Sequence, residues 1–186
     1  MINATRYDKE FKGNKSLLKG EYENCTFTNC DFANADLSNY IFTDCDFDNC
    51  DLSMAKINNT AFREVRFKNC KLLGLRFDEC SDFLLSFKFT GSLMNFSSFY
   101  KLKLKNTLFN DCKLEQVEFI EADLTKAIFN KCDLDRAVFE KTILEKVDFR
   151  TAYNYSINPE YNKLSKAKFS TNELAGLLGK YDIIIE

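Results

Sequence analysis

Between residues 107 and 149, a large apolar residue stands at every fifth position of the chain. These residues are Phe109, Leu114, Phe119, Leu124, Phe129, Leu134, Phe139, Leu144 and Phe149. A small or β-branched residue stands two positions before each of them, and the other three positions are mostly polar. A period of five fits neither the 3.6 residues of a helix nor the 2.0 of a continuous strand. It predicts short extended segments separated by turns, in which residues two apart face one interior.

A longer period of twenty residues is superimposed on the period of five. Large residues alternate between Leu and Phe, and Cys112 recurs as Cys132. If each coil contains four repeats, residues of the same type would therefore stack on each other in successive coils. The same pattern begins near Leu17 and runs to Phe77. The sequence thus predicts an all-β solenoid, and its low content of Gly and Pro suggests corners that need neither Gly nor a fixed φ.

Several five-residue motifs resemble the loose A(D/N)LXX consensus of the pentapeptide-repeat family. They lie at 35–39 (ADLSN), 45–49 (CDFDN), 122–126 (ADLTK) and 132–136 (CDLDR). The resemblance covers about residues 20–150. It implies a right-handed quadrilateral β-helix in which four repeats make one square coil.

The chain reads as a single domain with three parts. Residues 1–16 are polar and lack the repeat, so we expect a ragged or helical lead-in, followed by the repeats over residues 17–169. After Phe77 the pattern slips by two residues, which requires a bulge or small loop near residues 78–88. This interruption is either a tolerated insertion or a protrusion that contacts a partner.

Residues 170–186 are expected to form a short helix and a strand-like run. Ser170 to Glu173 resembles a capping box that opens the helix, and Gly179 would end it. An open solenoid end exposes backbone groups and apolar side chains, so this segment should cover it. It is either a simple cap or, as in family members that dimerise this way, the seam of an end-to-end homodimer. The candidate seam residues are Leu174, Leu177, Leu178, Ile183, Ile184 and Ile185.

The eight cysteines all occupy the small position of the repeat. They are Cys25, Cys30, Cys45, Cys50, Cys70, Cys80, Cys112 and Cys132. Ala, Thr and Val occur at equivalent positions, so the cysteines are expected to be small, buried and reduced. With no CxxC motif and no His, the sequence indicates neither a metal site nor a cofactor.

No arrangement of residues indicates catalysis. The absence of His removes the commonest general base, and no Gly-rich phosphate loop is present. We therefore expect a protein that is not an enzyme. No apolar run approaches the ~20 residues of a membrane span, and the N-terminus does not resemble a secretory signal, so a cytoplasmic location is expected.

Acidic residues are concentrated in the first repeats. Residues 21–55 contain eight acids and no Lys or Arg. The candidate partner surface consists of Asp31, Asp36, Asp44, Asp46, Asp48 and Asp51, with Asp78, Glu79 and Asp82 at the interruption. A net charge of -2 speaks against direct binding to nucleic acid. The acids either form an ordinary solvated surface or mimic duplex DNA toward a cationic groove.

Within the family, the chain most resembles the Qnr-type quinolone-resistance and microcin-immunity group. The resemblance includes the tail from Ile157 to Asn162 (INPEYN) and the Leu-rich segment that follows it. It implies a partner, DNA gyrase or topoisomerase IV, that is protected from poisons. The alternative is a general interaction scaffold with an unrelated protein partner. Binding to a topoisomerase by mimicry of DNA predicts one continuous acidic stripe, whereas the scaffold predicts acids scattered over four faces.

Overall fold

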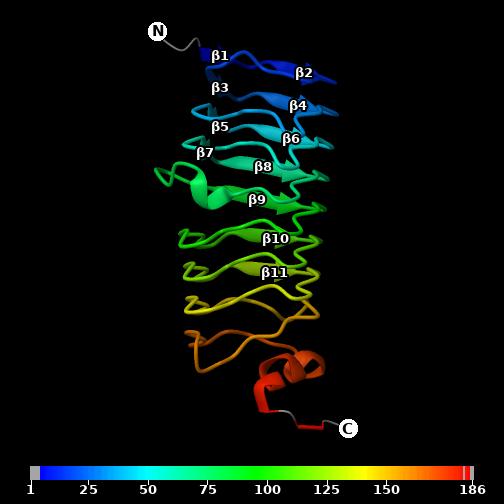
Figure 1. The fold of residues 1–186 in the computed structure, drawn as a ribbon, viewed down its shortest axis with the longest axis vertical. Coiled ribbons are helices and arrows are strands. Elements are labelled where there is room, and N and C mark those ends of the chain that lie inside the picture. Colours follow the sequence, from blue (N-terminus) through cyan, green and yellow to red (C-terminus); the bar gives the residue numbers. More distant parts are fainter. Residues whose placement is uncertain (1–4, 182, 185–186) are drawn as a thin grey trace.

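The chain folds into a single rod of stacked, four-sided coils (Figure 1). The structure is a computed structural model, and it describes residues 5–181, 183 and 184. The N-terminal strands lie at one end of the rod and a helical segment lies at the other (Figure 1). Phe109 pairs with Phe129 in parallel, one coil of twenty residues later. The expected quadrilateral β-helix of pentapeptide repeats is therefore confirmed.

Two parallel sheets form two adjacent faces of the rod. Face one contains β1 (Thr5–Tyr7), β3 (Glu21–Glu23), β5 (Ile41–Thr43) and β7 (Ala61–Arg63). Face two contains β2 (Glu10–Lys12), β4 (Thr26–Thr28), β6 (Asp46–Asp48), β8 (Val65–Lys68), β9 (Phe87–Thr90), β10 (Leu108–Asn110) and β11 (Ile128–Asn130). Single parallel bridges form the other two faces. Asp31, Asp51 and Lys71 lie on face three, and Asp36 and Lys56 lie on face four.

The first coil begins earlier than the sequence indicates. Strand β1 pairs with β3 and strand β2 pairs with β4, so the described part of residues 1–16 belongs to the solenoid. The expectation of a ragged or helical lead-in is therefore wrong for these residues. Thr5 pairs with Glu21, an offset of sixteen residues rather than twenty, which breaks the period. Phe11 stacks on Phe27 at 5.0 Å and supplies a large inward side chain.

Phenylalanine rings build the core as stacks along the rod axis. The rings of Phe109 and Phe129 are 4.7 Å apart and tilted by only 2°. Phe119, from another face, meets Phe129 edge-on at 5.7 Å and 84°. Both geometries are favourable for aromatic pairs. Each fully buried ring contributes roughly 1.5–3 kcal/mol through removal of apolar surface from water.

Where the small position of a repeat holds Cys, Thr or Ser, its side chain can also donate a hydrogen bond to the backbone. The Cys50 thiol donates to the carbonyl of Phe27 at 3.3 Å, and the Thr60 hydroxyl donates to the carbonyl of Leu37 at 2.7 Å. In both cases the acceptor lies in the preceding coil. All eight cysteines are buried and unbridged, which confirms their predicted packing role. The thiols satisfy backbone carbonyls as well as filling space.

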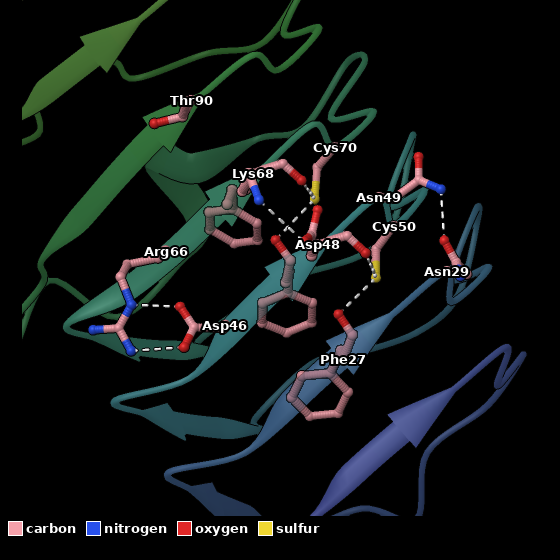
Figure 2. A network of polar contacts seen from close by, with 12 residues as sticks. Phe27, Asn29, Asp46, Asp48, Asn49, Cys50, Arg66, Lys68, Cys70 and Thr90 are labelled. Atoms are coloured by element: carbon pink, nitrogen blue, oxygen red, sulfur yellow. Dashed lines mark hydrogen bonds and ion pairs between the residues drawn. The ribbon is translucent and has the colours of Figure 1, made fainter.

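The corners do require a particular backbone conformation, contrary to the expectation from composition. Non-glycine corner residues adopt φ values between +50° and +63°. In the first repeats most of these residues are Asn, which tolerates this left-handed region better than other non-glycine residues. Asn49 donates through its side chain to Asn29 at 2.6 Å, so stacked corner amides also bind each other (Figure 2).

The interruption is a two-residue insertion on face one. Ser81 pairs with Ala61 twenty residues earlier, whereas Phe87 pairs with Val65 twenty-two residues earlier. The two extra residues therefore lie between Ser81 and Phe87. A turn of 3₁₀ helix, η1 (Phe77–Glu79), precedes them. The segment that contains η1 and the insertion projects from the side of the rod near β9 (Figure 1).

The C-terminal segment covers the last coil, but its local structure differs from the prediction. It consists of 3₁₀ helices η2 (Thr171–Leu177) and η3 (Gly179–Tyr181). The Ser170 side chain makes no capping hydrogen bond, so the predicted capping box does not form. Gly179 begins η3 rather than ending the helical segment. Gly176 packs closely against Tyr155, and the Ile157 N–H donates to the Gly176 carbonyl at 2.8 Å, so tertiary contacts hold this segment against the last coil.

The predicted C-terminal strand is not present in the part of the tail that the structure describes. Ile183 and Ile184 belong to no strand, and Ile185 lies outside the described residues. Both described isoleucines are exposed, and Leu177 instead packs against the core. The cover over the last coil is therefore made by η2.

Candidate protein-binding surface

The six aspartates predicted in the first repeats lie on different sides of the rod. Asp46 and Asp48 lie on face two, in β6. Asp31 and Asp51 lie on face three, and Asp36 lies on face four. Asp44 occupies the corner between faces one and two, between β5 and β6, with φ of 50°. These side chains do not form one continuous acidic stripe.

Three of these aspartates are paired with cations from the next coil, and Figure 2 shows the pairs of Asp46 and Asp48. Arg66 binds Asp46 through two nitrogens, with Nη2 at 2.8 Å from Oδ2. Lys68 lies 3.4 Å from Asp48. Lys71 lies 3.7 Å from Asp51. The register of twenty residues brings each cation beside an acid, so the first repeats carry mixed charge rather than the expected negative surface.

Asp31 and Asp36 stabilise the corners that follow them. The Asp36 carboxylate accepts a hydrogen bond from the Ser38 N–H at 2.9 Å, and Asp31 accepts one from Ala33 at 3.3 Å. Hydrogen bonding from Ser38 lowers the pKa of the Asp36 carboxyl below its ordinary value. Such bonds from an aspartate to the backbone two residues later are typical of turns.

The acids at the interruption lie close to the insertion. Arg76 binds Asp78 through Nε at 3.0 Å and Nη2 at 2.7 Å, and this pairing raises the pKa of the Arg76 guanidinium. Glu79 accepts a hydrogen bond from the Asn58 side chain at 2.7 Å. Asp82 is exposed at the start of the insertion. Asp78 and Glu79 are thus tied to the rod, and Asp82 faces solvent.

An exposed apolar pair forms the tip of the insertion. Phe83 is 63% exposed and Leu84 is 65% exposed. The guanidinium of Arg63 lies 5.5 Å from the Phe83 ring centre, which supports the ring from the rod side. Leu84 has φ of 58°, an unusual conformation for a bulky residue. We refer to Phe83 and Leu84 as the apolar tip.

The insertion lies where the slipped repeat predicts it, whereas the predicted contact residues there are all acidic and do not include the apolar tip. The signal for the apolar tip was present, because Phe83 and Leu84 are consecutive apolar residues within the slipped part of the repeat. Neither residue could occupy an inward position while Ser81 and Phe87 keep their pairing. The slipped register therefore predicts that the side chains of Phe83 and Leu84 are exposed.

The candidate dimer seam combines inward and outward side chains. Leu177 packs against the core, and Leu178 is half-buried. Leu174, Ile183 and Ile184 are exposed. Lys180 forms an ion pair with Glu160, which ties η3 to the last repeats. The outward residues leave an apolar surface at this end of the rod.

Two further properties hold for residues 5–181, 183 and 184. No helix there combines the length and apolar character that crossing a bilayer requires. No three His, Cys, Asp or Glu side chains come together in a way that could hold a metal ion.

A rod of this kind, with stacked rings inside and paired polar groups outside, defines a parallel β-solenoid with four faces in each coil and a capped C-terminal end. The model of the pentapeptide repeat region matches residues 16–81, 40–119 and 102–177. The chain therefore belongs to the pentapeptide-repeat family. No curated protein sequence gives a significant match.

Solved structures of QnrB1, a plasmid-mediated fluoroquinolone resistance protein, are similar over almost the whole chain. A trypsin-treated form of QnrB1 matches with a TM-score of 0.65 and 19% identity, over 99% of this chain and 98% of that one. Full-length QnrB1 matches with a TM-score of 0.50 and 21% identity, over 97% and 100% of the two chains. At this level of identity, the similarity concerns the fold.

Proposed function

We propose that this protein is a non-enzymatic rod that binds another protein, and that its partner is DNA gyrase or topoisomerase IV. The observation that carries the proposal is the apolar tip, which lies on the inserted segment beside charged residues that are tied to the rod. Exposed apolar side chains beside fixed charged groups are typical of protein-binding sites. The choice of partner rests on the likeness to QnrB1 and on the tail that resembles the quinolone-resistance and microcin-immunity group.

The proposed contact surface is centred on the insertion. Phe83 and Leu84 would supply the apolar contact, and Asp82 would supply an exposed charge beside it. The rod holds this surface in place, because Arg63 supports Phe83 and Arg76 binds Asp78. A preorganised contact loses less conformational entropy on binding than a mobile loop would.

The structure supports mimicry of duplex DNA less well than contact through the insertion. Asp46, Asp48 and Asp51 each have a cationic partner, and the predicted acids face several directions. This arrangement favours a second candidate function, a general scaffold whose partner is an unrelated protein. The two candidates differ in the protein that the insertion would contact, which is a topoisomerase in the first and an unrelated protein in the second.

A gyrase reaction separates the two candidates. We would titrate the purified protein into supercoiling reactions with and without a fluoroquinolone, and measure supercoiled and cleaved DNA. The proposal predicts less drug-induced cleavage, or less supercoiling, at near-stoichiometric protein. Unchanged products with gyrases and topoisomerase IV enzymes from several bacteria would leave the scaffold function.

A further inference from the structure

The sheet on face one has a break directly below the insertion. Ser81 N–H donates to the Thr60 carbonyl at 3.0 Å on one side of the break, and Asp123 N–H donates to the Leu102 carbonyl at 2.9 Å on the other. Between them, over the part of the chain that the structure describes, no backbone hydrogen bond joins residues 80–86 to residues 102–107. Lys103 N–H therefore lacks the ladder partner that its equivalents have in other coils.

The break is confined to face one and its corner. On face two, Lys88 pairs with Leu108 and the ladder continues without interruption. The inserted residues lie outside the ladder, whereas Lys103 in the coil below still forms its parallel bridge with Asp123. The result is a notch of about 310 Å³, lined on one side by residues 85–88 and on the other by residues 103–107.

The notch carries an excess of positive charge. Lys88, Lys103 and Lys105 line it, with Glu64 as the opposing charge. Lys105 lies 3.1 Å from Asp123, whereas Lys88 and Lys103 form no ion pair with any described residue. The notch therefore has three cations, but only one acid in its lining, Glu64, and one acid beside it, Asp123.

Lys101, Lys103 and Lys105 alternate along the chain and form a short basic strip. Lys103 and Lys105 belong to that strip and line the notch. Lys101, the third member, instead lies 4.7 Å from the centre of the Tyr100 ring and 3.6 Å from Glu121. Lys101 is thus paired away from the notch, and Lys103 is the member of the strip that lines the notch without an ion pair among the described residues.

We propose that this notch binds an oxyanion, either a phosphate or a carboxylate group. The Lys88 and Lys103 ammonium groups would donate charge-assisted hydrogen bonds, which are stronger than those between neutral groups. The unpaired Lys103 N–H adds a fixed backbone donor at the same position. The oxyanion comes either from free phosphate or from an acidic side chain of a protein that docks on this face.

Binding is tested on the isolated full chain, without a topoisomerase, so its outcome is independent of the proposed function. We would titrate ¹⁵N-labelled protein with sodium phosphate, and separately with a short Asp- and Glu-containing peptide, at constant ionic strength set with sodium chloride. Saturable shifts of the amides at 85–88 and 103–107 are expected. The ligand that binds identifies the source of the oxyanion.

Matched variants test whether the notch itself is responsible. Lys103→Gln should weaken binding at least about tenfold, the loss expected for one hydrogen bond to a charged group. Lys113→Gln, on face three of the same coil, should bind like the unaltered protein and melt at the same temperature as Lys103→Gln. Three results would overturn the proposal: amide chemical-shift changes that are equally large with sodium chloride alone, changes that spread to all surface lysines, or changes that persist in Lys103→Gln.

Discussion

The ring of Phe87 lies 5.6 Å from the ring of Phe62, inside the rod, although Phe87 occupies a position that holds a small residue in other coils. In the coil of the insertion, Asp82 stands where face one normally presents a large inward residue, and it points to solvent. Phe87 also contacts Phe77 at 5.2 Å, so its ring occupies the space that Asp82 leaves. The two-residue insertion is tolerated because the core remains filled.

Removal of this ring should be costly. Phe87→Ala is expected to lower the free energy of unfolding by about 3–5 kcal/mol, because it leaves a cavity that the surrounding coils cannot close. Phe83→Ala removes the same group from the exposed tip and should cost less than about 1 kcal/mol. Denaturant unfolding of the two variants measures both values. Equal losses would contradict the role assigned to Phe87.

The contact between η2 and the last coil should not tolerate a methyl group at Gly176. A Cβ there would overlap the carbonyl oxygen of Tyr155 and lie 2.8 Å from its ring atom Cδ2. Gly176→Ala should therefore displace η2 and cost roughly 1–3 kcal/mol. At Gly179 the nearest atom would be Ser156 Oγ at 3.7 Å, an ordinary contact, so Gly179→Ala is the control. Thermal melts that rank the two variants equally would show that the cap is not packed as described.

Stability should decrease in alkaline solution. Burial raises the pKa of the Cys45 thiol from 9.0 to about 12, and it raises the pKa of the Tyr155 hydroxyl from 10.0 to about 12. The unfolded chain loses these protons first, so these two groups leave stability unchanged below about pH 9 and lower it between pH 9 and 12. Melting temperatures across this range measure the decline. Cys45→Ala should make it less steep, and an unchanged slope would remove Cys45 from the explanation.

The end-to-end homodimer remains a prediction that the exposed C-terminal residues make testable. Ile184 is 88% exposed, so Ile184→Asp disturbs little within one chain but places a charge in the proposed seam. Light scattering should give the mass of two chains for the unaltered protein and of one chain for the variant. Leu18→Asp, at an exposed site near the other end, is the control. An unaltered protein with the mass of one chain would exclude this seam.

Much of the fold follows from the sequence, because the repeat determines both the number of residues in each coil and which side chains point inward. The stack of Phe109 on Phe129 and the burial of Cys50 follow from the periods of five and twenty. The pairing of Asp46 with Arg66 could also have been predicted by adding twenty to the residue number. The run of acids along residues 21–55 overstates the negative charge of the surface, because Arg66, Lys68 and Lys71 lie beside three of the acids in the next coil.

Other features could not be predicted from the repeat. The first coil has an offset of sixteen residues, so Phe11 has no periodic neighbour to reveal it. Within the insertion the repeat gives no register, and the inward position of Phe87 emerges only from packing. The local signal for a capping box at Ser170 was overridden by the contact of Gly176 with Tyr155, which is a tertiary interaction.

The most direct test of the proposed function is equilibrium binding of the protein to purified gyrase and topoisomerase IV. The unaltered chain should bind one of these enzymes. A Phe83→Asp, Leu84→Asp double variant should bind at least about tenfold more weakly, as expected when a central apolar contact is lost. Reversal of Asp46 and its partner Arg66 to Lys and Asp keeps that ion pair and should change binding little. Absence of binding by the unaltered protein, or equal binding by the Phe83→Asp, Leu84→Asp variant, would contradict the proposal.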